Sequence, residues 1–376
     1  MENLYLPNDT SEAKPSQIDN FALRLNKYPE THSDKFVIYH KYRENKRDKT
    51  IKANTDLQNS TKQILEFSAR YLSSLRKLSE LQVEFSAFQP DWRLIIGLGS
   101  PSVYETSITL HHIYGFPYIP GQAVKGVTRN HVICEYFEKN EEKAENNEEF
   151  KRIFGTQEQK GKVIFFDAYP QTEPKLAFDI MNVHYPKYYS GEKEPTDDQN
   201  PNPITFLTVK DTTFFFPIGF PKNEDEKFTF KGKTVLEVIK TALEEKGIGA
   251  KSSVGYGFMK KDEEADTKLE ADLEEYEQKL EKKRGKAEKQ KMLEEMTELD
   301  KKLYNISLEN DREKKRSLSM EIFSQIDTYS DAEKIKIALQ LKDIWEELGI
   351  WKKQKKKQKE KVKTIADILS GWNVIN

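Results

Sequence analysis

The feature that most constrains the fold of this 376-residue chain is a sharp change of pattern after Lys260. Short apolar segments bounded by glycine and proline come before that point, whereas residues 262–376 contain no strand pattern. Charged residues make up 33% of the chain and hydrophobic residues 36%, which is too polar for one compact body of this length. We therefore expect a domain of strands and helices before this point and a solvated helical part after it.

Apolar residues after Lys260 keep the spacing of three and four that marks one face of a helix, with Glu and Lys around them. They are Leu269, Leu273, Tyr276 and Leu280, then Met292, Met296, Leu299 and Leu303, then Ile337, Leu341, Ile344 and Leu348. This spacing predicts a charged helical extension over residues 262–376, packed on itself or on a partner. Eight lysines within residues 352–363 form either a solvated helix face or a contact with a phosphate backbone.

Residues 1–89 are predicted to form an N-terminal segment that packs on the core and contains an amphipathic helix. The helix is indicated by apolar residues at helical spacing from Asp56 onward, namely Ile64, Phe67, Tyr71, Leu75 and Leu78. We expect it to end before Pro90, because a proline disfavours the helical conformation in the residue before it.

Residues 90–261 are predicted to form the core domain. Strands are expected at residues 92–99, 162–168, 176–183 and 256–260, with a pair joined by a tight turn over 204–220, and helices at 122–137 and 234–246. This order suits an α+β fold in which an antiparallel sheet carries both helices on one face, the ferredoxin-like (RRM-like) plan. The polar, proline-rich segment at about 189–203 should project as an inserted loop.

The bulk properties exclude several classes of protein. A formal net charge of -2 means that any binding to nucleic acid or to a membrane must depend on local patches. The single cysteine, Cys134, excludes an internal disulfide and a cysteine-rich metal site, and the six histidines lack zinc-site spacing. We expect no metal and no cofactor. Because no signal-like or membrane-spanning segment is present, we expect a soluble, cytoplasmic protein that does not bind membranes.

The glycine-rich stretch GIGAKSSVGYG, residues 247–257, is the first candidate binding element. Gly247, Gly249, Gly255 and Gly257 flank Lys251, Ser252 and Ser253, which such a loop can present to an anion together with its backbone N–H groups. The stretch is not a nucleotide-hydrolase phosphate loop, because that motif leads directly from Gly-Lys-Ser into a helix. A helix cap followed by a bent edge strand explains the glycines equally well.

The segment FPYIPGQAVKGVTR is the second candidate, because a helix is expected to begin at about Gln122. Its free N–H groups favour an anion, and Lys125 and Arg129 are four residues apart on the same face. Together these groups form a possible phosphate site. The alternative is two solvent-facing charges on an ordinary helix.

Several segments resemble the RAMP superfamily of CRISPR proteins. YIPGQAVKGVTR is similar to its "IPGSSLKGALR" segment, and GIGAKSSVGYG to the glycine-rich loop near the end of its domains. Between them, FGTQEQKGKVIFFDAYP, MNVHYPKYY and NPNPITFLTV resemble the family formed by the sixth subunits of Cmr, or type III-B, effector complexes. The likeness covers about residues 90–260. The N-terminal region fits more loosely, and the extension is not part of it.

The resemblance implies a scaffold subunit of an RNA-guided antiviral complex, in which target cleavage belongs to another subunit. Its partners would be the guide RNA near the 3′ end, other RAMP backbone subunits and a small helical subunit, with the target RNA as a further candidate. The guide backbone would lie across Lys125, Arg129 and the whole glycine-rich loop, without sequence reading. Tyrosines that either stack on bases or pack internally are Tyr185, Tyr188, Tyr189 and Tyr256.

Two other functions remain open at this point. The first is a metal-independent guide-processing endoribonuclease, since such enzymes of the same superfamily carry a similar loop. In that function, His111 or His112 together with Lys125 and Tyr256 would act as the acid, the base and the oxyanion-stabilising group. The second is a protein–protein adaptor that acts through its helical tail. Asp167 and Asp179 could form a catalytic carboxylate pair. Because acidic residues are abundant in this chain, two of them in strand patterns are weak evidence for such a pair.

Overall fold

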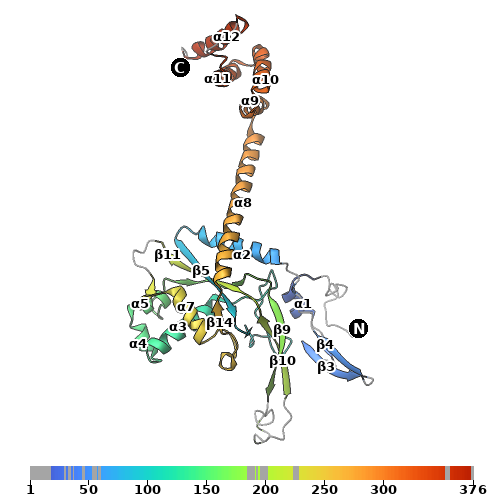
Figure 1. Cartoon of the computed structure of the whole chain (residues 1–376), viewed down its shortest axis with the longest axis vertical. Helices are drawn as coiled ribbons and strands as arrows, with labels where there is room; N and C mark the ends of the chain where they lie inside the picture. The colour runs from blue at the N-terminus through green and yellow to red at the C-terminus, as the bar shows by residue number, and fades with distance from the viewer. Residues whose placement is uncertain are drawn as a thin grey trace. The chain divides into compact units, whose positions relative to one another are not determined.

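The computed structural model describes residues 18–28, 31–32, 35–36, 38–44, 47–52, 57, 61–183, 191, 194, 202–222, 228–351 and 356–373. The chain forms two compact units, Met1–Lys279 and Leu280–Asn376 (Figure 1). The boundary between the units falls inside the long helix α8 (Glu263–Glu295). Among the helices that the structure describes, none has an apolar stretch long enough to cross a membrane.

The core of the first unit is an antiparallel sheet with strand order β14-β5-β11-β7, in which β8 also pairs with β11. These strands are β5 (Leu81–Pro90), β7 (Ile164–Phe165), β8 (Tyr169–Pro170), β11 (Phe214–Pro221) and β14 (Met259–Lys261). Helix α3 (Gly121–Tyr136) lies in the chain between β5 and β7, and helix α7 (Val235–Glu245) between β11 and β14. The chain order around this sheet is therefore strand, helix, two paired strands, helix, strand.

Both faces of this sheet are buried. Along β11, Phe214, Phe216 and Ile218 join the cluster that includes α3 and α7, whereas Phe215 joins a second cluster with helix α2 (Thr61–Arg76) and the start of α8. Alternate residues of a strand point to opposite faces, so α3 and α7 cover one face and α2 and α8 the other. The continuous apolar run FFFPIGF is typical of a strand buried on both sides.

A second antiparallel sheet has the order β6-β10-β9, and Figure 1 shows its long strands β9 and β10 side by side. Its strands are β6 (Arg93–Leu94), β9 (Lys175–Val183) and β10 (Asn202–Lys210). The expected inserted loop at 189–203 and the tyrosines Tyr185, Tyr188 and Tyr189 lie almost wholly outside the described residues; only 191, 194 and the start of β10 are within them.

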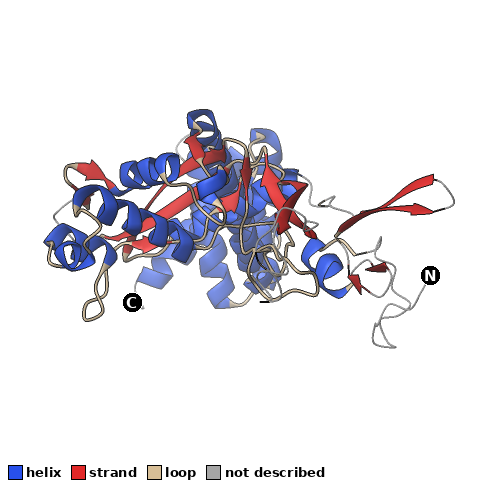
Figure 2. Ribbon diagram, turned by 90° about the horizontal axis from the view of Figure 1, so that it is seen from below, coloured by secondary structure: helices blue, strands red, loops and turns tan. Residues whose placement is uncertain are grey.

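In the described residues before position 53, the chain forms one short helix and two strand pairs. Figure 2 shows the β3–β4 ribbon extending away from the core. The elements are α1 (Phe21–Lys27), β1 (Thr31–His32), β2 (Lys35–Phe36), β3 (Tyr39–Glu44) and β4 (Arg47–Lys52). Small elements elsewhere in the first unit are α4 (Glu141–Glu145), α5 (Glu148–Phe154), β12 (Thr229–Phe230), β13 (Lys233–Thr234) and the 3-10 turn η2 (Ser252–Val254).

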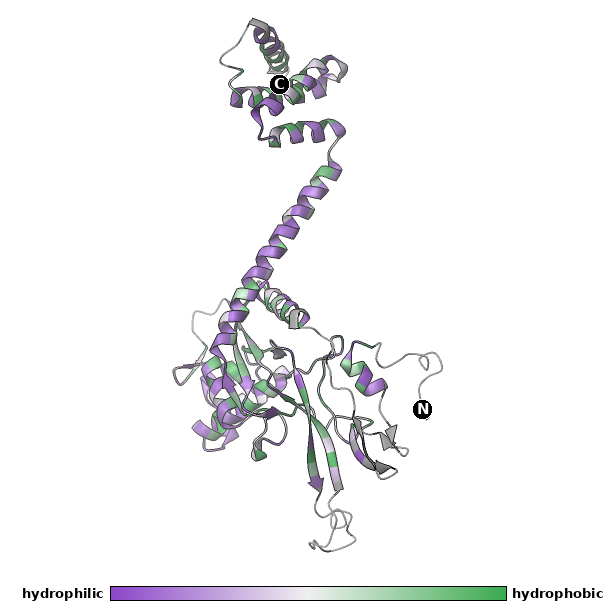
Figure 3. Ribbon diagram, turned by 45° about the vertical axis from the view of Figure 1, so that its right-hand side comes forward, coloured by the Kyte–Doolittle hydropathy of each residue, from purple (hydrophilic) through white to green (hydrophobic). Residues whose placement is uncertain are grey.

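The second unit is helical and has its own core around the buried Trp345. Its members after α8 are α9 (Glu298–Leu308), α10 (Arg312–Ser324), the 3-10 turn η3 (Ile326–Thr328), α11 (Asp331–Glu347) and α12 (Lys356–Asn373). The Trp345 indole donates to the Ser319 hydroxyl at 3.1 Å, and the buried Lys315 ammonium pairs with Glu347 at 2.8 Å. Figure 3 shows that α8 itself is mostly hydrophilic along its length.

Four expectations differ from the structure. The N-terminal helix was expected to end just before Pro90. Helix α2 instead ends at Arg76, and the residues up to Pro90 form the interior strand β5. The expected strand at 92–99 is paired only over β6, since the carbonyls of Ile95 and Ile96 accept from Ala250 and Thr109 in loops.

The expected pairing across the turn at 204–220 is absent as well. Strand β10 pairs with β6 and β9, and β11 pairs with β5, β7 and β8, so both edges of each strand are taken by other partners. Finally, the first compact unit continues to Lys279 rather than ending near 261. The buried Leu269 and Leu273 of α8 join the core, and Gln171 donates to the Ala265 carbonyl at 2.7 Å.

Candidate nucleic-acid interface

The glycine-rich loop is closed by backbone hydrogen bonds between its ends and to the segment after β5. Ile248 donates to the Gly257 carbonyl at 2.8 Å, and Gly257 donates to the Arg93 carbonyl at 2.8 Å. Ala250 donates to the Ile95 carbonyl at 2.9 Å. The base of the loop is therefore fixed on the core, and its middle residues project from a rigid support.

The close approach of these backbones explains why glycine is needed at the base. Gly249 has a φ of +92°, and a Cβ placed there would lie 2.2 Å from the Ile95 carbonyl oxygen. Gly247, Gly255 and Gly257 also have positive φ values. The base of the loop thus has features of the alternative explanation, a helix cap followed by a bent edge strand, because Gly247 follows the last residues of α7 and the chain then leads to β14 at the sheet edge.

The tip of the loop, residues 251–255, has unpaired donors. Lys251 is in the left-handed conformation and leads into the single turn η2, which Ser252 begins. Within the described residues, the Lys251 ammonium, the hydroxyls of Ser252 and Ser253 and the N–H groups of both serines make no hydrogen bond. The neighbouring Val254 is 65% exposed. The tip thus offers several donors and one positive charge without an internal acceptor.

Tyr256 is a structural residue in this conformation. Its side chain is 8% exposed, and its hydroxyl donates to Asp179 at 2.9 Å. Burial is the larger cause and the hydrogen bond to Asp179 the second cause that raise the pKa of Tyr256 to about 12. Asp179 also pairs with Arg93 at 2.7 Å, and the Tyr256 ring packs 4.9 Å from the Trp92 ring. Tyr256 therefore anchors the loop, and its ring is not free to stack on a base.

The start of helix α3 is capped from within the chain. Asp167 accepts from the Gly121 N–H at 2.7 Å, so its carboxylate occupies the place predicted for a bound anion. A Cβ at Gly121 would lie 2.2 Å from the Phe165 carbonyl oxygen, which shows how tightly this end packs. Asp167 and Asp179 therefore belong to separate hydrogen-bond groups, one at the start of α3 and one with Arg93 and Tyr256.

Lys125 and Arg129 differ in availability. Arg129 pairs with Glu141 at 2.6 Å and with Glu145 at 2.8 Å, so its charge is already neutralised by α4. Lys125 makes no ion pair within the described part of the chain; burial, with the Arg129 charge as a second cause, lowers its pKa. Of the two predicted helix contacts, only Lys125 is free for an anion. No hydrogen bond or ion pair among the described residues joins α3 to the loop tip.

The candidate catalytic residues of the endoribonuclease hypothesis fall into separate groups. His111 lies among aromatic rings, 5.7 Å from Phe67 and 5.4 Å from Phe116, and its Nδ1 accepts from the N–H groups of Ile113 and Tyr114. No hydrogen bond or ring contact within the described chain links His111 to Tyr256.

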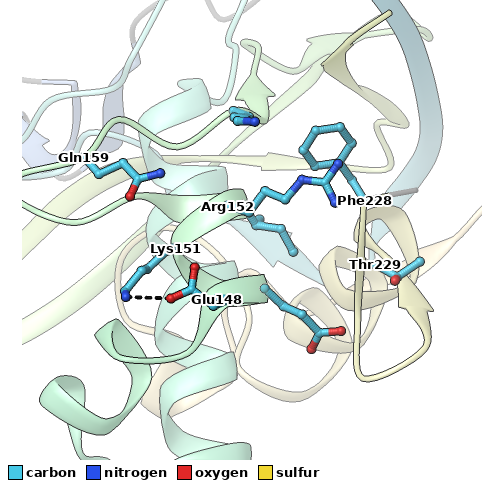
Figure 4. A pocket seen from close by; sticks show the side chains of 9 residues that line it. Glu148, Lys151, Arg152, Gln159, Phe228 and Thr229 are labelled. Carbon is cyan, nitrogen blue, oxygen red and sulfur yellow. Dashed lines mark hydrogen bonds and ion pairs between the residues drawn. The ribbon is translucent and has the colours of Figure 1, made fainter. Parts of the chain in front are cut away.

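A pocket of about 570 Å³ lies at α5, outside the residues that the sequence singled out (Figure 4). Lys151 pairs with Glu148 at 2.8 Å, and the Arg152 guanidinium carbon is 4.2 Å from the Phe228 ring centroid. The segment FKRIFG could have indicated this basic helix turn, but Phe228 comes from a distant part of the chain. The lining carries both signs of charge, and we assign it no ligand.

Comparisons with known proteins place the middle of the chain in a defined family. The model of the RAMP superfamily matches residues 93–260. A protein of Pyrococcus furiosus named CRISPR system Cmr subunit Cmr6 is 36% identical over 270 residues, covering 56% of this chain and 78% of the relative. A Cmr6 subunit of Saccharolobus solfataricus is 29% identical over 172 residues, covering 44% of this chain and 54% of that one.

Two solved structures are also similar. The crystal structure of Cmr6 from Pyrococcus furiosus is 36% identical, with a TM-score of 0.34, covering 49% of this chain and 99% of that chain. A chain in the cryo-EM structure of the type III-B Cmr-beta bound to cognate target RNA is 26% identical, with a TM-score of 0.44, covering 55% of this chain and 67% of that chain.

Proposed function

Because this chain belongs to the Cmr6 family of the RAMP superfamily, we propose that it is a non-catalytic backbone subunit of a type III-B Cmr effector complex. In that role it binds the guide RNA near its 3′ end and contacts neighbouring RAMP subunits and a small helical subunit. The relatives named as Cmr subunits support the assembly. A similar chain in a complex bound to cognate target RNA makes target RNA a further partner to test.

We propose that the core sheet follows the ferredoxin-like plan. The strand order β14-β5-β11-β7 corresponds to fourth, first, third and second in chain order, with one helix after the first strand and one after the third. All neighbours are antiparallel, and α3 and α7 share one face. These features support that topology.

The unpaired donors of the loop tip carry the proposal of guide binding. Lys251, Ser252 and Ser253 project from a base that is hydrogen-bonded to the core, so the tip keeps its shape before RNA arrives. Phosphate oxygens are acceptors and carry negative charge, which this set of donors matches. Such contacts do not read bases, as binding of exchangeable guides requires.

Helix α3 contributes to this surface through Lys125 rather than Arg129. Lys125 has no internal acid partner, whereas Arg129 must leave Glu141 and Glu145 to reach a phosphate. We therefore assign Lys125 the direct contact and Arg129 a role in fixing α4 against α3. The start of α3 binds no RNA phosphate, because Asp167 already accepts from the Gly121 N–H there.

The competing endoribonuclease function has less support. A metal-independent reaction needs the acid, base and oxyanion-stabilising groups at one reacting phosphate. Tyr256 is tied to Asp179, and no contact in the described chain joins it to His111. An RNA cleavage assay without metal, with a His111→Ala/His112→Ala variant alongside, tests this function; specific cleavage that the variant loses would replace the scaffold proposal.

A salt series on guide binding tests the proposal. Lys251→Ala should weaken binding equally for guides of unrelated sequence and reduce the slope of log affinity against log salt by about 0.7, the value for one single-strand phosphate contact. The matched control is Lys240→Ala on α7, a half-buried lysine paired with Glu244 at 3.9 Å. An unchanged slope in Lys251→Ala, together with unchanged guide affinity in a Ser252→Ala/Ser253→Ala variant, would contradict the phosphate role of the tip.

A further inference from the structure

Three side chains that commonly bind metal ions meet where α3 packs on α7. His131 and Glu135 lie on α3, and Glu245 lies in the last turn of α7. One ligand atom from each residue lies within 4.8 Å of the other two. His131 and Glu135 are four residues apart, so they share one face of α3. The sequence did not indicate this group, because the fold brings Glu245 to the other two.

His131 is a buried residue with an unsatisfied nitrogen. Its side chain is 2% exposed, and its Nδ1 is buried without a hydrogen-bond partner. Native proteins rarely leave such an atom unpaired. The nearest acidic atom, Glu245 Oε2, is 3.6 Å from Nδ1, which is too long for a hydrogen bond. It is close to the separation of about 3.3 Å between two ligands of a tetrahedral zinc ion with bonds of about 2.0 Å.

The charges around the group are compatible with a cation. Burial lowers the pKa of His131, with Glu245 and Glu135 opposing this and Lys246 and Lys233 adding to it. A metal ion binds an imidazole nitrogen through its lone pair, and no hydrogen-bond partner occupies Nδ1 of His131. Lys246 bonds one carboxylate oxygen of Glu135 at 2.9 Å, which leaves the second oxygen for an ion. Both glutamates are exposed, so an ion can reach the group from solvent.

We propose that His131 Nδ1, Glu135 and Glu245 bind one divalent transition-metal ion of the zinc class, which joins α3 to α7. An imidazole nitrogen with two carboxylates favours such an ion over Mg²⁺ or Ca²⁺, which prefer oxygen ligands alone. Three protein ligands leave a fourth position for water. Gly247 follows Glu245 by two residues, so the ion would also fix the end of α7 from which the glycine-rich loop begins.

Zinc binding by the metal-stripped full chain tests this proposal. We expect about one Zn²⁺ per chain by calorimetry and elemental analysis, and a higher Tm with Zn²⁺ because the ion binds the folded state. Glu135→Gln and Glu245→Gln, which change exposed side chains, should each weaken Zn²⁺ binding at least tenfold and remove the Tm increase. Mg²⁺ should give no comparable effect.

Two control variants separate this site from adventitious binding. Glu244→Gln changes the adjacent carboxylate on α7, and Cys134→Ser removes the single thiol of the chain, which precedes Glu135. Both should bind Zn²⁺ as the unaltered protein does. The proposal is wrong if the unaltered chain binds no Zn²⁺, if the two glutamate variants bind it normally, or if Cys134→Ser abolishes binding.

Discussion

Gly249 and Gly255 have similar backbone conformations in different surroundings. Their φ values are +92° and +99°, but a Cβ at Gly249 would meet the Ile95 carbonyl, whereas nothing lies within 4 Å of a Cβ at Gly255. Alanine at either position should cost about 1–2 kcal/mol for the left-handed backbone. Gly249→Ala should lose a further ~1–3 kcal/mol through overpacking. Urea unfolding of the two variants checks this difference; equal losses would contradict the close approach.

His111 makes stability depend on pH. Burial is the main cause that lowers its pKa, with Asp167 opposing and His112 adding to the shift. The unfolded imidazole, with a pKa of about 6.5, then binds protons at a pH where the folded one does not. Its contribution to stability is therefore full above about pH 6.5 and is lost as pH falls through that value toward the folded pKa.

His111→Gln removes this titration and keeps an acceptor for the two N–H groups that Nδ1 serves. Between about pH 7 and pH 5, the Tm of the variant should fall less steeply than that of the unaltered protein. Above about pH 7 the two slopes should coincide, which is the internal control. A variant slope as steep as the original at low pH would show that His111 is not held neutral.

At the scale of elements, α8 connects the core to the rest of the chain and is itself part of the core. The buried Leu269 and Leu273 pack with Ile64, Phe67 and Leu72 of α2. A chain that ends after Lys261 should therefore lose stability and expose apolar surface, whereas one that ends after Glu295 should keep the stability of the first unit. Thermal unfolding and dye binding of the two shortened chains measure this. Equal stability of the two shortened chains would contradict a contribution of α8 to the core of the first unit.

The elements predicted correctly were those with strong local signals. The helix at 234–246 has a Thr234–Glu237 capping box and is followed by Gly247, and the strand expected at 176–183 is β9. Strand β5 was missed because Leu81, Phe85 and Phe88 also continue the three-and-four spacing of α2, which masks the strand-like alternation of apolar and polar residues in LQVEFSAF. Whether β10 and β11 pair depends on which strands occupy their edges, which no local pattern reveals.

The candidate site was also predictable only where a local sequence signal marks it. The glycine spacing indicated a tight loop, and the structure shows its base closed on Arg93 and Ile95. The partners Glu141 and Glu145 of Arg129, and the capping of α3 by Asp167, depend on tertiary contacts. Sequence spacing could place a charge on a helix face, but it could not show which charges the fold already neutralises.

At the scale of the whole molecule, the two units have separate cores. The second core is built around Trp345, Leu341 and Ile337, all fully buried. Leu341→Ala should destabilise this unit by about 2–5 kcal/mol through loss of packing. Scanning calorimetry should then show a lower transition temperature for the second unit and an unchanged one for the first. A shift of both transitions would show that the units unfold together.

The central claim, that the loop tip contacts the guide RNA backbone, is tested most directly by cross-linking within an assembled Cmr complex. A photoreactive residue in place of Ser253, which is exposed at the tip, should cross-link to the guide RNA, with equal yield for guides of unrelated sequence. Cross-links to protein alone, or a yield that depends on the guide sequence, would contradict the account.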